Sequence, residues 1–188
     1  TVAGFPPFII FIKTFEDIIV PEVEKQLKES GGKYKIQWTR AYGASIAKEE
    51  NTLEAIADGL GDIGFVPFIF EESKAPLQVV TYIAPFVSYD PRVLHEVQDE
   101  MYNNIPALNE ALHKQNQIYL AGSTINSFQI FSRVPITKVG DLKGLKFGLA
   151  GPLASWLKGT GGISVHNPVS EGYAALKSGM IDAQIIFP

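Results

Sequence analysis

The residues that could perform chemistry are few and widely separated. His95 and His113 fall in a stretch with helical spacing, where we expect solvated side chains, and only His166 ends a predicted strand. No partner histidine or cysteine stands at a metal-ligand spacing, so we expect no metal site. The absence of cysteine excludes thiolate catalysis and disulfides. An acid–base pair of His166 and Glu171 is the enzymatic arrangement left open, and it lacks an identifiable proton-transfer partner.

The other polar motifs favour binding over catalysis. Glu49-Glu50 and Glu71-Glu72 are adjacent carboxylates, which do not face each other on a helix, so we expect solvated faces. Gly151-Pro152 opens a predicted helix and could seat an anion. Residues 159–162 (Gly-Thr-Gly-Gly) follow a helix, and we expect a turn there and no phosphate cradle. We therefore expect no catalytic residue and no cofactor.

Composition narrows the classes of protein further. The chain has 188 residues, of which 46% are hydrophobic and 11% aromatic, and this excludes a disordered chain. Its net charge of −4 and the lack of a basic run argue against nucleic-acid binding. No apolar run reaches eighteen residues, so we expect no membrane insertion. A first residue other than Met suggests a processed or trimmed N-terminus, and the lack of thiols fits an oxidising compartment.

Apolar periodicity predicts alternating strands and helices, which is typical of a parallel α/β sheet. The predicted helices cover residues 8–27 (kinked at Pro21), 46–58, 92–114 (interrupted at Pro106), 153–158 and 170–178. The predicted strands cover residues 1–5, 34–38, 63–66, 79–83, 117–121, 128–132, 145–149, 163–166 and 181–187.

A repeat at a constant offset of 120 residues suggests two related halves. The helix-terminating pattern of Ala55, Gly59 and Asp62 returns as Ala175, Gly179 and Asp182. Ala3-Gly4 and Ala150-Gly151 also stand at strand-to-helix turns that we expect to correspond. Similar turns occur in unrelated α/β proteins, but the shared position within each βαβαβ pattern favours two related lobes.

Ligands on parallel α/β sheets bind beyond the carboxyl ends of the strands. We therefore expect a two-lobed α/β fold with a ligand cleft between the lobes and a hinge. Its expected parts are a first lobe at 1–116 with a helical insert, linking strands at 117–140 and the start of a second lobe at 141–188. Phe5, Tyr42 and Phe65 lie at expected strand ends and could pack in the core or line the site.

Several stretches resemble one family of transport receptors. These are residues 15–36, 53–64, the Asp-Leu-Lys-Gly-Leu-Lys segment at 141–146, and Ser-Glu-Gly-Tyr-Ala-Ala-Leu with its following Gly and Asp at 170–182. Their order and spacing resemble the solute receptors of tripartite ATP-independent periplasmic (TRAP) transporters, the DctP-like family. The resemblance implies a type II periplasmic-binding-protein fold that captures a small solute and delivers it to a TRAP membrane permease.

The sequence departs from the family at the positions that hold carboxylates. Where many members carry a substrate-clamping Arg, this chain has Gly148, and a second Arg of some members corresponds to Phe128. A family Asn corresponds to Ile186, and an aromatic position corresponds to Val169. An enclosed carboxylate needs a cation or several N–H donors.

Three residues could supply that charge: Arg40, which we place first, Arg133 and His166. The predicted ligand-binding residues are Phe5, Arg40, Tyr42, Phe65, Phe128, Gly148, Val169 and Ile186.

We therefore expect a periplasmic, non-enzymatic receptor for a small organic acid, with aromatic or hydrophobic acids favoured over short dicarboxylates. Two alternatives stay open: an enzyme on the same fold that uses His166 and Glu171, and a ligand-sensing domain of a signalling system. Because the second lobe would end on its third strand, we also expect the C-terminal part of the receptor to be missing from this chain.

Overall fold

The computed structural model describes residues 1–84, 87–167 and 169–187, and the chain divides into two compact units. Unit 1 comprises Thr1–Pro67 with Leu112–Ile118, and unit 2 comprises Phe68–Ala111 with Tyr119–Pro188. Residues 68–111, which we expected in the first lobe, pack with unit 2. The lobe boundaries of the receptor stay a prediction.

Unit 1 is built on a parallel sheet with the strand order β2-β1-β3. Its elements in chain order are β1 (Val2–Gly4), α1 (Ile10–Thr14), a π-helical turn (Phe15–Ile19), α2 (Val20–Glu29), β2 (Arg40–Tyr42), a 3-10 turn (Glu49–Asn51), α3 (Thr52–Ala57) and β3 (Ile63–Gly64). The core of this unit contains Val2, Ile12 and Leu53, each with at most 2% of its surface exposed.

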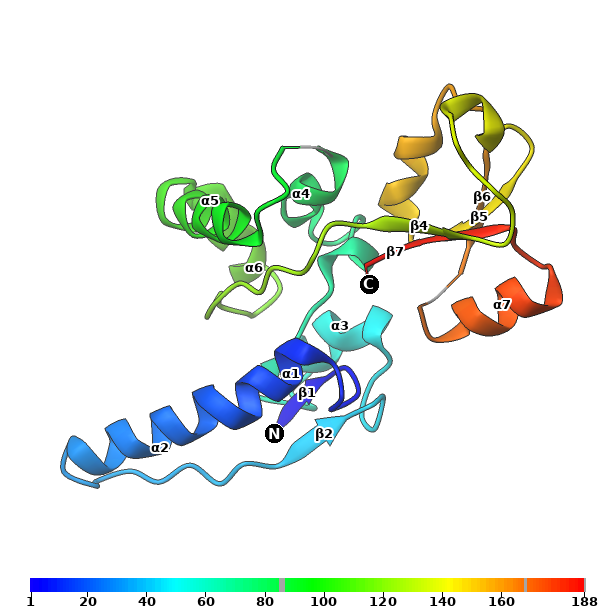
Figure 1. Cartoon of the computed structure of the whole chain (residues 1–188). Helices are drawn as coiled ribbons and strands as arrows, with labels where there is room; N and C mark the ends of the chain where they lie inside the picture. Colours follow the sequence, from blue (N-terminus) through cyan, green and yellow to red (C-terminus); the bar gives the residue numbers. More distant parts are fainter. Residues whose placement is uncertain (85–86, 168, 188) are drawn as a thin grey trace. The chain divides into compact units, whose positions relative to one another are not determined.

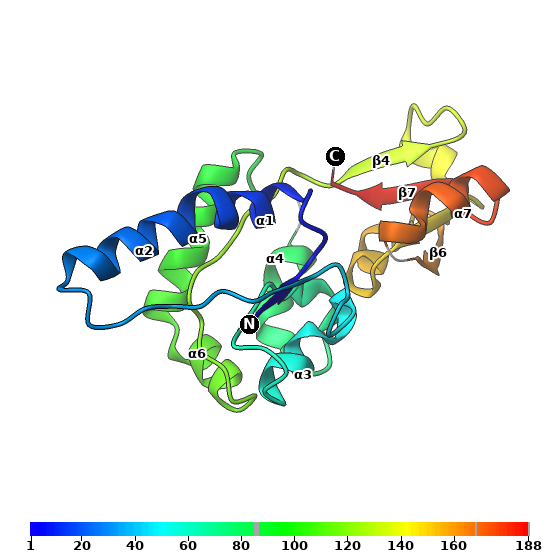
Figure 2. The same cartoon turned by 90° about the horizontal axis from the view of Figure 1, so that it is seen from below.

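Unit 2 is built on a mixed sheet with the strand order β4-β7-β5-β6, in which only the β4–β7 pair is antiparallel. Its strands are β4 (Gln129–Ser132), β5 (Lys146–Leu149), β6 (Ile163–His166) and β7 (Ala183–Ile186). Its helices are α4 (Val80–Ile83), α5 (Pro91–Asn104), α6 (Pro106–His113, whose last residues belong to unit 1) and α7 (Gly172–Ser178). Its 3-10 turns are Phe68–Phe70, Pro76–Val79, Val139–Leu142, Gly151–Leu157 and Val169–Glu171. Figure 2 shows α7 running along the sheet beside β7.

The predicted helix near the start of the chain is confirmed, and it contains a π-helical turn just before Pro21. Figure 1 shows α1, the π-helical turn and α2 as one continuous rod. Proline has no backbone N–H and its ring clashes with the carbonyl one turn earlier. Here the N–H of Val20 donates to the carbonyl of Phe15, five residues back, so the helix widens by one residue just before Pro21. A local π-turn therefore accommodates the proline.

The 120-residue repeat is visible in the backbone of both units. The N–H of Asp62 donates to the carbonyl of Thr1 at 2.8 Å, and the N–H of Asp182 donates to the carbonyl of Lys146, also at 2.8 Å. Each aspartate carboxylate in turn accepts a hydrogen bond from the backbone nitrogen of that same residue. Asp62 therefore connects the start of β3 to the start of β1 in unit 1, and Asp182 connects the start of β7 to the start of β5 in unit 2.

The strand register corrects one part of the predicted repeat. Ala3 of β1 pairs with Gly64 of β3, and Gly148 of β5 pairs with Gln184 of β7. Because Gly64 and Gln184 are 120 residues apart, the counterpart of Ala3 is Gly148. The expected counterpart at Ala150-Gly151 is wrong by two residues.

Three predicted strands do not form. Residues 34–38 are extended but pair with no described strand, and both Tyr34 and Ile36 are exposed. Residues 79–83 are helical, because the turn started by Pro76 runs directly into α4 and overrides the β-branched residues there. Residues 117–121 form no strand in the described chain, and the Gln117 side chain donates to the carbonyl of Leu53 instead.

Candidate functional site

Phe5 and Phe65 follow β1 and β3 and belong to one aromatic cluster of unit 1. The ring of Phe11 lies 5.0 Å from Phe5, edge to face, and 5.9 Å from Phe65. Phe15 meets Phe65 at 5.3 Å and Trp38 at 5.7 Å, both edge to face. Phe5 is buried and Phe65 is half-buried. These rings pack the first helix against the sheet. Of the two roles considered for Phe5 and Phe65, this contact corresponds to packing in the core.

Arg40 and Tyr42 are brought together by a residue that the sequence analysis missed, Glu16 of the π-helical turn. The guanidinium Nη2 of Arg40 lies 2.9 Å from Oε2 of Glu16, and its Nε contacts both carboxylate oxygens at 3.1 and 3.2 Å. Its Nη1 donates to the carbonyl of Trp38, and the hydroxyl of Tyr42 donates to Oε1 of Glu16 at 2.5 Å. Arg40 opens β2, whereas the strand predicted in this region ended at residue 38.

The electrostatics of this cluster follow from its hydrogen bonds. The hydrogen bonds from Arg40, with a further one from Tyr42, hold the pKa of Glu16 below its ordinary value. Burial raises the pKa of the Tyr42 hydroxyl, and its bond to the Glu16 carboxylate raises it further. The Arg40 cation is thus satisfied within the protein. Its helical partner, 24 residues earlier in the chain, carries no local motif that could have revealed it.

In unit 2, Phe128 sits in a second aromatic cluster just before β4. Its ring lies 6.2 Å from Tyr82, 6.0 Å from Trp156 and 6.0 Å from Phe187, each edge to face. The indole Nε1 of Trp156 donates to the carbonyl of Tyr82 at 2.8 Å. Burial raises the pKa of the Tyr82 hydroxyl to about 12. The position corresponding to the family's second Arg is therefore occupied by an apolar ring in an aromatic setting.

Gly148 lies buried in the central strand β5, beside a pair of buried amides. The Nδ2 of Asn167, directly after β6, donates to Oε1 of Gln184 in β7 at 3.0 Å. Both amide side chains are 3% exposed. Neither residue was predicted, although Asn167 directly follows the predicted strand at 163–166.

The remaining predicted residues of unit 2 are spread along the strand ends. Val169 begins a 3-10 turn and is 38% exposed, and Ile186 ends β7 and is half-buried. His166 and Glu171 are both exposed.

Arg133 does not lie at the carboxyl ends of the parallel strands. Its N–H donates to the carbonyl of Asp182, and a Cβ added at Gly179 would lie 2.7 Å from its Nη1. Both of these residues precede β7, so Arg133 sits at the amino edge of the sheet, opposite the strand ends.

The paired carboxylates do not all form solvated faces. Glu71 is 1% exposed, and its carboxylate lies 3.7 Å from Nζ of Lys74. The expectation is wrong here because the 3-10 turn Phe68–Phe70 folds the chain inward, and the N–H of Glu71 closes that turn on the carbonyl of Phe68. Burial raises the pKa of Glu49, which is half-buried.

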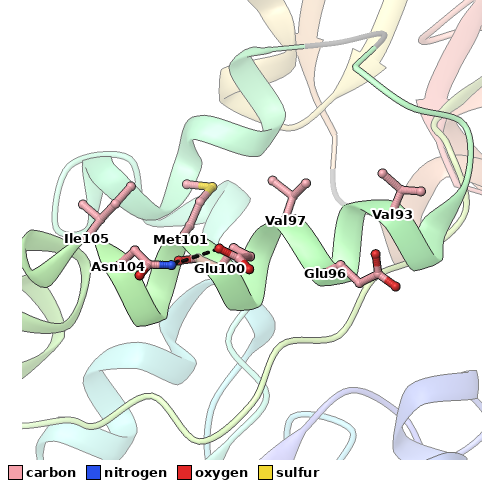
Figure 3. Close-up of a pocket in the computed structure, with 7 residues that line it drawn as sticks. All are labelled: Val93, Glu96, Val97, Glu100, Met101, Asn104 and Ile105. Atoms are coloured by element: carbon pink, nitrogen blue, oxygen red, sulfur yellow. Dashed lines mark hydrogen bonds between the residues drawn. The ribbon is translucent and has the colours of Figure 1, made fainter.

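An open groove of about 430 Å³ runs along one face of α5, away from the strand ends (Figure 3). Its apolar side chains come from successive turns of the helix: Val93, Val97, Met101 and Ile105. Glu96 and Glu100 also line it, and Asn104 donates to the carboxylate of Glu100. Since no strand end contributes to this groove, we do not assign the solute to it.

Within residues 1–84, 87–167 and 169–187, no group of three or more acidic or histidine side chains is arranged to hold a metal ion. No helix among these residues is both long enough and apolar enough to cross a membrane.

Comparison with protein families decides the class of protein. The model of the family described as "Bacterial extracellular solute-binding protein, family 7" (DctP) matches residues 19–186. This chain belongs to that family. The members are transport receptors of the TRAP type and not enzymes, which confirms the resemblance drawn from the sequence. A search of curated proteins gives no match.

Solved structures of TRAP periplasmic solute-binding proteins share the α/β fold. A protein from Chromohalobacter salexigens with bound D-glucuronate is 19% identical with a TM-score of 0.77, and it aligns with 98% of this chain and 60% of its own. DctP6 of Bordetella pertussis, which binds pyroglutamic acid, is 20% identical with a TM-score of 0.74, over 98% and 59%. A Haemophilus influenzae protein with bound L-gulonate is 19% identical with a TM-score of 0.74, again over 98% and 59%. The chain thus spans about 60% of the length of the solved receptors it resembles.

Proposed function

We propose that this chain is the solute-capturing part of a periplasmic receptor that binds a small organic acid and delivers it to a TRAP membrane permease. Membership of family 7 supports the receptor role. The structural neighbours with bound D-glucuronate, pyroglutamic acid and L-gulonate support an organic acid as the class of solute. The permease is the partner that such a receptor requires.

We infer from the residues at the strand ends of unit 2 that the acid has an apolar or aromatic body. The carrying observation is that Phe128 packs among aromatic rings where some relatives are expected to carry an Arg. Gly148 and Ile186 likewise contribute no charge. In unit 1 the aromatic cluster lies beside an Arg40 whose guanidinium is already paired with Glu16. A short dicarboxylate would leave at least one carboxylate poorly compensated in such surroundings.

A thermal-shift screen tests this function. We expect aromatic monoacids such as phenylacetate and benzoate to raise the melting temperature of the protein in a concentration-dependent way, since a ligand of the folded state stabilises by mass action. Succinate and malate serve as the matched short diacids and should give little or no shift. Stabilisation by these diacids with none by aromatic acids would contradict the proposed specificity. The absence of any shift with aromatic acids, sugar acids and short diacids alike would contradict the receptor function.

A further inference from the structure

Helix α5 carries a second apolar row besides the face that it buries. On the buried face, Tyr102 is 8% exposed and stacks on Tyr119 with ring centroids 3.6 Å apart. The second row lines the open groove of α5, and Figure 3 shows its side chains at intervals of four residues on one side of the helix: Val93, Val97, Met101 and Ile105. The two valines and the isoleucine are 43%, 41% and 44% exposed. Much of this row is therefore left to solvent although the other face of α5 is packed.

The spacing of the row favours a helix as its partner. Residues four apart on a helix form a ridge, and a ridge over residues 93–105 extends for about 18 Å at a rise of about 1.5 Å per residue. Such a ridge packs into the groove between the ridges of a second helix. Met101 has an unbranched side chain that adapts to the shape of a partner. A row of this kind is a common recognition surface for the apolar face of an amphipathic helix.

The side chains beside the row are acidic. Glu96 and Glu100 line the groove, and Asp99 is also exposed on α5. With Glu110, residues 93–111 contain four carboxylates and no Lys or Arg. The whole chain has 20 acidic and 16 basic residues, so the remainder of the chain holds 16 of each, and this stretch carries all of the excess negative charge. A complementary partner must bring Lys or Arg, whereas an anionic lipid surface or a nucleic acid would be repelled.

We propose that the apolar row of α5 and its acidic flank form a docking surface for a basic, amphipathic helix of a partner protein. Val97 and Met101, in the middle of the row, contact the apolar face of that helix. Glu96 and Glu100 pair with Lys or Arg at its edges. This surface is separate from the strand ends considered for the solute, so the inference goes beyond the proposed function.

Fluorescence anisotropy with labelled peptides of about 18 residues tests this surface. The probe has Leu at the helical positions i, i+3, i+4 and i+7 and Lys at the others. We expect it to bind the chain with a dissociation constant below about 100 µM, and about five or more times more tightly than a scrambled peptide of the same composition. A third peptide, with Glu in place of Lys, should not bind. No binding of the probe, or equal binding of the probe and either other peptide, would overturn the proposal.

A variant of the apolar row assigns the binding to α5. Val93→Gln/Val97→Gln should weaken probe binding about fivefold or more without lowering the melting temperature, because both side chains are exposed and Gln favours a helix. Ile18→Gln/Ile19→Gln is the matched control, since these side chains are 59% and 45% exposed on the helical rod of unit 1, and it should leave binding unchanged. Equal effects of the two variants would overturn the assignment.

A charge variant tests the acidic flank. Glu96→Gln/Glu100→Gln should weaken probe binding and make it less sensitive to salt, because screening acts on the charges that have been removed. Glu22→Gln/Glu24→Gln, on α2 of unit 1, makes the same change in net charge and should leave the binding and its salt dependence as they are. Binding that is indifferent to the α5 charges would overturn the charge complementarity on which the proposal rests.

The same variants separate the other possible occupants. Self-association of the chain in analytical ultracentrifugation that Val93→Gln/Val97→Gln abolishes would assign the row to a second copy. Loss of probe binding in a form of this receptor as long as the solved relatives would assign the row to the receptor's own chain. Either result would overturn the proposal.

Discussion

The Glu16 carboxylate should be the main electrostatic support of unit 1, and removing its charge should cost measurable stability. Glu16 accepts a two-pronged contact from Arg40 and a hydrogen bond from Tyr42. A hydrogen bond to a charged group contributes about 1.5–3 kcal/mol, and an exposed ion pair less than about 1 kcal/mol. With 25% of the Glu16 side chain exposed and 44% of that of Arg40, we expect Glu16→Gln to lower the free energy of unfolding by about 2 kcal/mol. For a chain of this size that is a fall of roughly 4–8 °C in melting temperature.

The stability lost in Glu16→Gln should depend on pH, and it should be smaller at acid pH. The pKa of Glu16 is lowered in the folded protein from the ordinary value of 4.5, chiefly by its hydrogen bonds from Arg40. The folded state therefore favours the ionised carboxylate, and the stabilisation is complete above pH 4.5 and is lost as the pH falls through the folded pKa. Urea unfolding followed by circular dichroism should show a constant gap between wild type and Glu16→Gln from pH 7 down to about pH 5. The gap should then narrow towards acid pH.

Glu22→Gln supplies the matched control. Glu22 lies on the same helical rod and pairs with Lys25 at 3.5 Å, but 49% of its side chain is exposed, so we expect a change within about 0.5 kcal/mol. If Glu16→Gln were no more destabilising than Glu22→Gln, or if its effect did not depend on pH, the assigned role of Glu16 would be refuted.

Four further variants test particular contacts and turns of the fold. Tyr119→Phe should leave stability unchanged or raise it by about 1 kcal/mol, because its hydroxyl is buried and has no hydrogen-bond partner in the described part of the chain; a loss in urea unfolding would contradict this. Gly59→Ala and Gly179→Ala should each cost about 1–2 kcal/mol for their φ of +78° and +79°, with no large difference between them, because the atoms near an added Cβ at Gly179 belong to the movable end of the exposed Arg133 side chain; an unchanged melting temperature in either variant would argue against the left-handed conformation. Trp156→Phe should lose about 1 kcal/mol with the hydrogen bond to Tyr82, and an unchanged melting temperature would show that this bond contributes nothing.

The α/β class and the repeat could be predicted from the sequence because both depend on local patterns. Gly59 and Gly179 adopt the left-handed conformation that ends a helix, and an Asp three residues later opens a strand in each unit. The strand at residues 163–166 is confirmed residue for residue. The strands that failed to form had the right alternation or β-branched residues, but a strand also needs a neighbour, and alternation cannot show where that neighbour lies.

The candidate site was only partly predictable, since its residues are joined by long-range contacts. Arg40 and Tyr42 were identified by their place near a strand end. Glu16 could not be identified in this way, because its contacts with them depend on how the helical rod packs against β2. Similarly, Gly148 was noticed as a departure from a family pattern, but nothing local indicates that Gln184, 36 residues later, fills the space beside it. The ligand-binding roles of all eight predicted residues stay a prediction.

The most direct test of the receptor function is native mass spectrometry of the purified chain incubated with aromatic monoacids, sugar monoacids and short diacids. We expect a one-to-one complex with at least one monoacid that survives buffer exchange, and no complex with succinate or malate. A one-to-one complex with these short diacids alone, or no complex with any acid at millimolar concentration, would contradict it.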